Sequence, residues 1–189
     1  MAKIYEFLAD GFEIIEALAP VDILRRGGQD VVTVSISDSL EVTSAQNQTV
    51  VANARLQDVE SFDDADWLLL PGGWPGADNL NKCEPLRQLL LAHYAKGRHI
   101  GAICAAPMVL GLLNLLQGKR ATCYPSFEEY LNGCTPTGEV VTVDGLITTG
   151  EGPAASLAYA YTILGQIISP EEVRELQHGM RYLHVIGEE

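Results

Sequence analysis

The stretch HIGAICAAPMVLGLLNLL, residues 99–116, sets a cysteine between two segments of different character. A short β-branched run precedes Cys104, and a run of Ala, Met, Val and Leu with helical spacing follows it. A cysteine at a junction of strand and helix is either a small buried hydrophobe or a nucleophile that points into a cleft. The rest of the chain shows which fold carries this junction.

Strand-like and helix-like segments alternate on both sides of residues 99–116. Strands are predicted over 3–8, 30–36, 66–73 and, briefly, 120–123, and hairpins over 41–54, at the sheet edge, and 140–149. Helices are predicted over 13–28, 84–96, 154–168 and after Pro170, and Pro20 should bend the first of them. This alternation predicts an α/β fold, a single doubly wound domain over 1–189 whose mostly parallel sheet has helices on both faces.

Composition and charge exclude several classes of protein. Twelve Lys and Arg against 25 Asp and Glu give a net charge of −13, which disfavours nucleic acid and anionic membranes as partners. No apolar run reaches the roughly 18 residues that a membrane span needs. The N-terminus MAKIYEFLADGFE lacks the apolar region and cleavage site of a signal peptide, so a cytoplasmic location is expected.

The pattern of cysteines, histidines and glycines predicts neither a metal nor a cofactor. Four cysteines are present, with no CxxC pair and no histidine at ligand spacing: Cys83, Cys104, Cys123 and Cys134. The phosphate-binding patterns GxGxxG and GxxxxGK[ST] are both absent. We therefore expect chemistry that depends on amino acid side chains alone.

Three features should meet beyond the carboxyl ends of the parallel strands, where ligands bind in such sheets. The first helix brings Glu16, and its apolar neighbours Ile14, Ile15 and Leu18 predict that this helix is buried. The strand over 66–73 ends in Gly72-Gly73, whose exposed N–H groups suit a developing negative charge. The third feature is Cys104, where a following helix N-terminus should favour the thiolate and lower the pKa of the thiol.

Four segments carry a resemblance to a known family: GFEIIEALAPVDILRRGG, LLLPGGWPGADNL, GAICAAPMVL and TTGEGPAAS. In this order and spacing they resemble the ThiJ/PfpI superfamily, and more narrowly its parkinsonism-associated deglycase and chaperone branch. The resemblance implies a flavodoxin-like fold with a nucleophile elbow, a homodimer without cofactor, and a small carbonyl compound as substrate.

The resemblance also implies roles for individual residues. Cys104 would be the nucleophile, Glu16 its carboxylic-acid neighbour, and the N–H groups of Gly73 and Ala105 an oxyanion hole. Substrate contacts would come from the residues lining the site, with an arginine supplied by the partner's first helix: Gly72, Tyr124, Gly152, Pro153 and Arg26.

Some residues depart from the family's patterns. The protease-like branch has a histidine directly after the cysteine, where this chain has Ala105, so peptidase activity is not expected. Tyr124 stands where animal members have a histidine, and tyrosine is a poor base near neutral pH. Arginines of the family are replaced near SAQNQ and at Glu151, which predicts a less cationic pocket.

Two functional classes fit these residues. In the first, Cys104 attacks a 2-oxoaldehyde or its adduct, and Glu16 shuttles the proton, as in a glyoxalase or deglycase. In the second, Cys104 is an oxidation sensor of a stress-response chaperone without turnover. Structural roles also stay open: Cys104 as a core thiol, Glu16 as a solvated carboxylate, Gly72-Gly73 as a turn and Tyr124 as a packing residue.

Overall fold

The computed structural model describes residues 1–189 and is built on one central sheet. Its strands are β1 (Lys3–Leu8), β2 (Asp30–Ser35), β5 (Ala54–Arg55), β6 (Trp67–Leu70), β7 (His99–Ile103), β10 (Val141–Asp144) and β11 (Ile147–Gly150). The order is β10-β11-β7-β6-β1-β2-β5, and every neighbouring pair is parallel except β10 and β11. The fold is therefore the expected single-domain, mostly parallel α/β fold.

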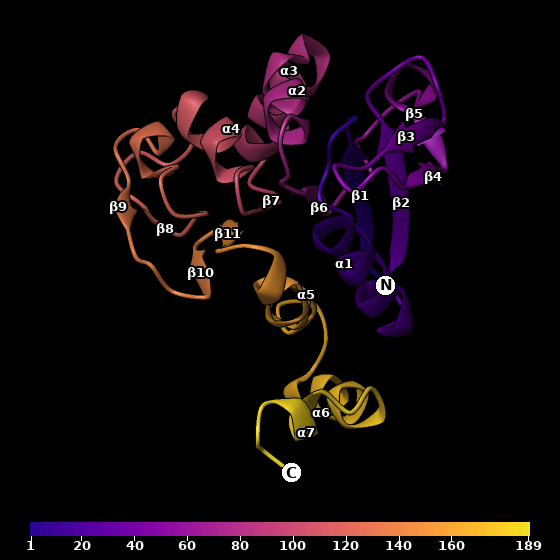
Figure 1. Cartoon of the computed structure of the whole chain (residues 1–189), viewed down its shortest axis with the longest axis vertical. Coiled ribbons are helices and arrows are strands. Elements are labelled where there is room, and N and C mark those ends of the chain that lie inside the picture. Colours follow the sequence, from indigo (N-terminus) through magenta and orange to yellow (C-terminus); the bar gives the residue numbers. More distant parts are fainter.

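Helices cover both faces of this sheet, also as expected. They are α1 (Ile14–Arg26), α2 (Gly76–Lys82), α3 (Glu84–Ala95), α4 (Pro107–Leu112), α5 (Ser156–Leu164), α6 (Pro170–Gly179) and α7 (Tyr182–Val185). In Figure 1, α1 and α5 lie below the sheet, and α2, α3 and α4 lie above it. The last two helices lie beyond α5, away from the sheet. Pro20 lies inside α1, which continues past it to Arg26.

The central strands are apolar because helices cover them on both sides. All four residues of β6, the run WLLL, are buried, and so are five of the six residues of β1. These two strands lie side by side in the middle of the sheet. One of the buried residues of β1 is charged: Glu6, of which only 1% is exposed.

Several predicted elements differ in the structure. The hairpin of β3 (Glu41–Thr43) and β4 (Thr49–Val51) forms a sheet of its own, and β5 occupies the edge of the central sheet. The short strand β8 (Arg120–Ala121) pairs with β9 (Thr135–Pro136), also outside the central sheet. The predicted helix over 154–168 is regular only in α5, after a 3-10 turn at Pro153–Ala155.

The helix after Cys104 is shorter than its sequence suggests. Only α4 is helical, and the chain soon turns at Asn114, which adopts the left-handed φ of 58° that often follows a helix end. Gly111 of α4 lies so close to the backbone of Tyr130 that a Cβ would collide with its carbonyl oxygen. α2, which the sequence analysis missed, has only seven residues and thus no clear periodicity.

Candidate active site

Cys104 occupies a strained turn directly after β7. Its φ is 63°, a left-handed conformation that non-glycine residues rarely adopt, and 8% of its surface is exposed. Two backbone hydrogen bonds hold the turn: the Cys104 N–H donates to Gly150 O at 2.9 Å, and the Tyr124 N–H donates to Cys104 O at 2.8 Å. Backbone strain that neighbouring segments stabilise is common at catalytic positions, and this is the geometry of a nucleophile elbow.

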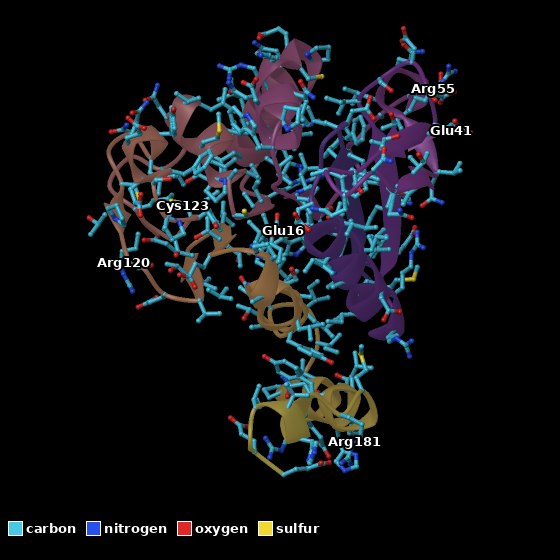
Figure 2. The ribbon with its side chains drawn as sticks, viewed as in Figure 1. Glu16, Glu41, Arg55, Arg120, Cys123 and Arg181 are labelled. Carbon is cyan, nitrogen blue, oxygen red and sulfur yellow. The ribbon has the colours of Figure 1, made fainter.

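Glu16 reaches the same place from α1 and is fully buried. Its Oε2 accepts a hydrogen bond from the Gly72 N–H at 2.9 Å, and its Oε1 has no partner. Figure 2 shows Glu16 near the middle of the molecule. The expected burial of Ile15 and Leu18 is wrong, because these two side chains are 49% and 36% exposed on the outer side of α1. α1 thus has an inner face with a carboxyl group and an outer face with apolar side chains.

Gly72 packs between Glu16 and Cys104. A Cβ at Gly72 would lie 2.6 Å from Glu16 Oε2 and 2.7 Å from the Cβ of Cys104, which no side chain tolerates. Gly73 has a left-handed φ of 86° and lies against the backbone of residues 11–13. The glycine pair therefore does more than end β6, because it lets the backbone approach both candidate catalytic side chains.

The surroundings of Glu16 favour its protonated form. Burial raises the pKa of Glu16 to about 7, and the negative charge of Glu13 acts in the same direction. Hydrogen bonds from the Cys104 thiol and the Gly72 N–H act the other way. A carboxyl group with this pKa exchanges its proton near neutral pH, as a general acid or base must.

The expected lowering of the Cys104 pKa is wrong for this geometry. Burial raises the pKa of the thiol most, and the charge and hydrogen bond of Glu16 raise it further. Backbone N–H groups of Gly73 and Ala105 both point at the sulfur and lower the pKa, but they do not outweigh burial. Because the repulsion comes from the ionised carboxylate, a proton on Glu16 removes it, so the thiolate and protonated Glu16 belong together.

Three of the expected substrate contacts line one cavity beside the elbow. Tyr124, Gly152 and Pro153 border a space of about 230 Å³, together with Glu151. The Tyr124 ring lies over Gly152, where a Cβ would be 3.2 Å from Cδ2, and the side chain is 46% exposed. A larger apolar cavity of about 440 Å³ lies beside Cys83, far from these groups along the sheet. The smaller cavity is the better candidate for substrate because its lining is joined to the elbow: the Tyr124 N–H donates to Cys104 O, and Glu151 directly follows Gly150, whose carbonyl accepts the Cys104 N–H.

Arg26 does not join the site of its own chain. It lies in the last turn of α1, ten residues or about 15 Å along the helix from Glu16. Its guanidinium is paired with Asp22 at 2.9 Å, and more than half of each side chain is exposed. The histidines lie elsewhere. His93 is on α3, where its ring contacts the carbonyl of His99 at the start of β7, and His178 and His184 lie beside Glu189.

Other groups of the chain suggest neither a metal site nor a membrane segment. No three His, Cys, Asp or Glu side chains gather where they could hold a metal ion. No helix has both the length and the apolar character to cross a bilayer.

Sequence reasoning missed several polar residues around the site. Gln46, in the turn of the β3–β4 hairpin, donates to the Glu13 carboxylate at 2.7 Å and accepts from the Ile14 N–H at 3.3 Å. Gln46 thus holds the start of α1 in place. It belongs to the segment SAQNQ, near which an arginine of the family was expected to be replaced. Glu6 and Tyr159 are buried behind Glu16, and a charged residue inside an apolar strand was the only signal for the first of them.

Comparisons with known proteins show the family to which the chain belongs. Residues 2–166 match the family model described as the DJ-1/PfpI family. Protein DJ-1 homolog B of Arabidopsis thaliana is 37% identical over 89% of this chain, which spans only 39% of that relative's length. The glutathione-independent glyoxalase DJR-1.2 of Caenorhabditis elegans is 30% identical over 87% of both chains. The structure of oxidized Toxoplasma gondii DJ-1 superposes with a TM-score of 0.90 at 31% identity, covering 95% of this chain and 98% of that one.

Proposed function

Because this chain belongs to the DJ-1/PfpI family, we propose that it is a cysteine-dependent enzyme acting on 2-oxoaldehydes or their adducts, with Cys104 as nucleophile and Glu16 as proton shuttle. The C. elegans relative named a glyoxalase supports this reaction class. The proposal concerns the domain present here, because the plant relative is more than twice as long as the region it shares with this chain.

One observation carries the proposal: a buried carboxyl group and a strained cysteine meet across Gly72, which has room only for a hydrogen. A fully buried Glu is rare unless it is paired or functional. The raised pKa of Glu16, about 7, suits a group that must give and take a proton in each cycle.

The reaction follows from these positions. The Cys104 sulfur bonds to the aldehyde carbon of methylglyoxal, and Glu16 transfers the thiol proton to the oxygen that becomes a hydroxyl. The N–H groups of Gly73 and Ala105 stabilise this oxygen while it carries charge, an effect of about 3–4 kcal/mol per donor in comparable sites. Glu16 then moves a proton from the sulfur-bearing carbon to the neighbouring carbonyl carbon, while the hydroxyl proton passes to the oxygen of that carbonyl. The product is a thioester, which water hydrolyses to lactate and free thiol.

Steady-state loss of methylglyoxal tests the proposal. The unaltered chain should turn over the substrate, whereas Cys104→Ser and Glu16→Gln should lose at least about 100-fold in rate. Cys83→Ser is the matched control, since Cys83 is a partly exposed thiol beside the other cavity and should keep full activity. Turnover that persists in Cys104→Ser would contradict the proposal.

A second function is favoured by the raised pKa of the Cys104 thiol. A thiol that is mostly protonated reacts slowly with carbonyl compounds and with peroxide alike, but a sensor has to react only once, whereas an enzyme must react in every cycle. In this alternative the protein is an oxidation-sensing stress-response chaperone, and Cys104 is the sensor. Absence of methylglyoxal turnover, together with suppression of client aggregation that changes on Cys104 oxidation, would favour the chaperone.

We also propose a homodimer and no peptidase activity. The outer side of α1 exposes Ile15 and Leu18, and Leu157 of the adjoining α5 is 37% exposed. An isologous contact on this face would cover these side chains, and the Asp22–Arg26 pair lies on the same stripe of α1. Such a contact gives Arg26 a role toward the second copy's site.

Peptidase activity is not expected, because no histidine lies beside Cys104 to act as its base. Casein should therefore stay intact when it is incubated with the protein.

A further inference from the structure

Three buried side-chain atoms without a hydrogen-bond partner lie on the α1 and α5 side of the sheet. They are Oε2 of Glu6, Oε1 of Glu16 and the hydroxyl oxygen of Tyr159. None of these side chains is more than 1% exposed. Buried polar atoms nearly always have partners, so three without one in the same region call for an explanation.

The sheet register brings Glu6 and Tyr159 to the same face. Glu6 is aligned with Leu69, and Leu69 with Gly101, so all three residues face the same way. A Cβ at Gly101 would collide with the Tyr159 hydroxyl and approach Leu69, which places the hydroxyl over this row of residues.

A second glycine links Tyr159 to the nucleophile elbow. The Tyr159 ring packs under Gly150, where a Cβ would lie 3.2 Å from the ring carbon Cδ2. The carbonyl of Gly150 is the group that accepts the Cys104 N–H. Tyr159 thus supports the backbone that holds Cys104, while its hydroxyl lies at Gly101, where the negative charges of Glu6 and Glu16 act on it.

Charge determines which of these groups ionises first. Burial and the negative charge of Glu16 raise the pKa of Glu6 well above its ordinary value, although Arg25 opposes this. Burial and both carboxylates raise the pKa of Tyr159. Glu16, which faces Cys104 and Glu13 on its other sides, titrates near 7. Tyr159 is therefore a neutral donor when Glu16 ionises, and burial favours the protonated form of Glu6 as well.

We propose that Glu6 and Tyr159 are positioning residues for the Glu16 proton: neutral hydrogen-bond donors on the buried side of Glu16 that decide how readily it releases that proton. Gly72 stabilises only one oxygen of the Glu16 carboxylate. A neutral donor that turns toward the other oxygen, Oε1, which has no partner, would stabilise the charge that remains when the proton has moved to sulfur or substrate. The proposal rests on the role given to Glu16 above.

A carboxyl titration tests this without any substrate, so its failure is distinct from failure of the glyoxalase proposal. The Glu16 signal of the full chain, labelled with 13C at glutamate carboxyls and assigned with Glu16→Gln, is followed from pH 4 to 10. Loss of a donor to the carboxylate raises its pKa, so Tyr159→Phe and Glu6→Leu should each raise the Glu16 midpoint by about one unit. Glu6→Gln retains a neutral donor and should leave it nearly unchanged.

Tyr161→Phe is the matched control, because Tyr161 lies on the same helix and donates instead to the Met180 sulfur at 3.2 Å. It should not move the Glu16 midpoint. Equal midpoints in Tyr159→Phe, Glu6→Leu and Tyr161→Phe would overturn the proposal, and so would a downward shift, which would mean that Glu6 is charged. If Glu6→Leu does not fold, Tyr159→Phe decides the question, since it removes a single oxygen atom.

Discussion

The Gly72 N–H donates to the Glu16 carboxyl across 2.9 Å, in a position where the α-carbon of Gly72 cannot carry a side chain. This contact joins the end of β6 to the inner face of α1. It satisfies one oxygen of a buried acid, and it fixes the distance between that acid and Cys104. The arrangement depends on the absence of one methyl group.

Gly72→Ala should therefore damage the site more than the fold. The new Cβ would force Glu16 Oε2 or the Cys104 backbone to move, at a cost of about 1–3 kcal/mol in the free energy of unfolding. Methylglyoxal turnover should fall at least about 10-fold in protein that is still folded by circular dichroism. Gly179→Ala, at a position with open space around it, is the control and should change neither property.

Stability should depend on pH through Glu16. Its folded-state pKa, about 7, is above the ordinary value of 4.5, so the folded state holds the proton more tightly than the unfolded one. The stability that this provides is complete below about pH 4.5 and is lost as pH rises through 7. The Glu16→Gln variant has no such loss. Its free energy of unfolding, measured by urea denaturation, should therefore rise relative to that of the unaltered chain by about 2–4 kcal/mol between pH 4 and pH 8. A gap that does not change with pH would contradict the burial argument.

Peroxide should oxidise Cys104 before the other three thiols. Burial raises the pKa of all four thiols, but at Cys104 part of the increase comes from the Glu16 carboxylate and disappears when Glu16 holds a proton. Two backbone N–H groups also point at the Cys104 sulfur, whereas Cys83, Cys123 and Cys134 each receive one. Protonated Glu16 adds a donor that stabilises a sulfinate, and Glu16→Asp, one methylene shorter, should weaken it. Peptide mass spectrometry over a peroxide series measures the order. Oxygen appearing first on another cysteine would remove the basis of the sensor alternative.

The exposed face of α1 should hold two copies together. Sedimentation at micromolar concentration should show a species of twice the chain mass of 20.5 kDa. Leu18→Arg should dissociate it, because a charge without a partner would be buried in an apolar contact. Val185→Arg is the control, being an exposed apolar side chain on α7, away from this face. A single species near 20.5 kDa in the unaltered chain would rule out the dimer.

The sequence was sufficient to predict the fold class, since β6 and the alternation around it have the pattern of a covered parallel sheet. It also identified Cys104, Glu16 and Gly72, which the structure brings together. The lower pKa expected for Cys104 was wrong, because the thiol is buried and the Glu16 carboxyl group lies beside the sulfur. Local sequence describes neither burial nor charge contributed by distant segments.

Three other residues show the same limit. In the sequence, Glu6 is only a charged residue inside an otherwise apolar strand. Its connection to Tyr159 depends on the pairing of β1, β6 and β7, which brings together segments that are far apart in the chain. Ile15 and Leu18 read as core residues because an apolar stripe on a helix has the same pattern whether its partner is its own sheet or a second molecule.

The Tyr159 ring fits under β7 and β11 only because Gly101 and Gly150 leave space for it. On the role proposed for Tyr159 and Glu6, a cysteine and a glutamate copied from this chain onto a related scaffold would not carry its proton chemistry with them. The unit to transplant includes two glycines on neighbouring strands, an aromatic residue on a helix and an acid in the central strand. In design, these positions have to be exchanged together, since any one of them alone leaves either a collision or a cavity.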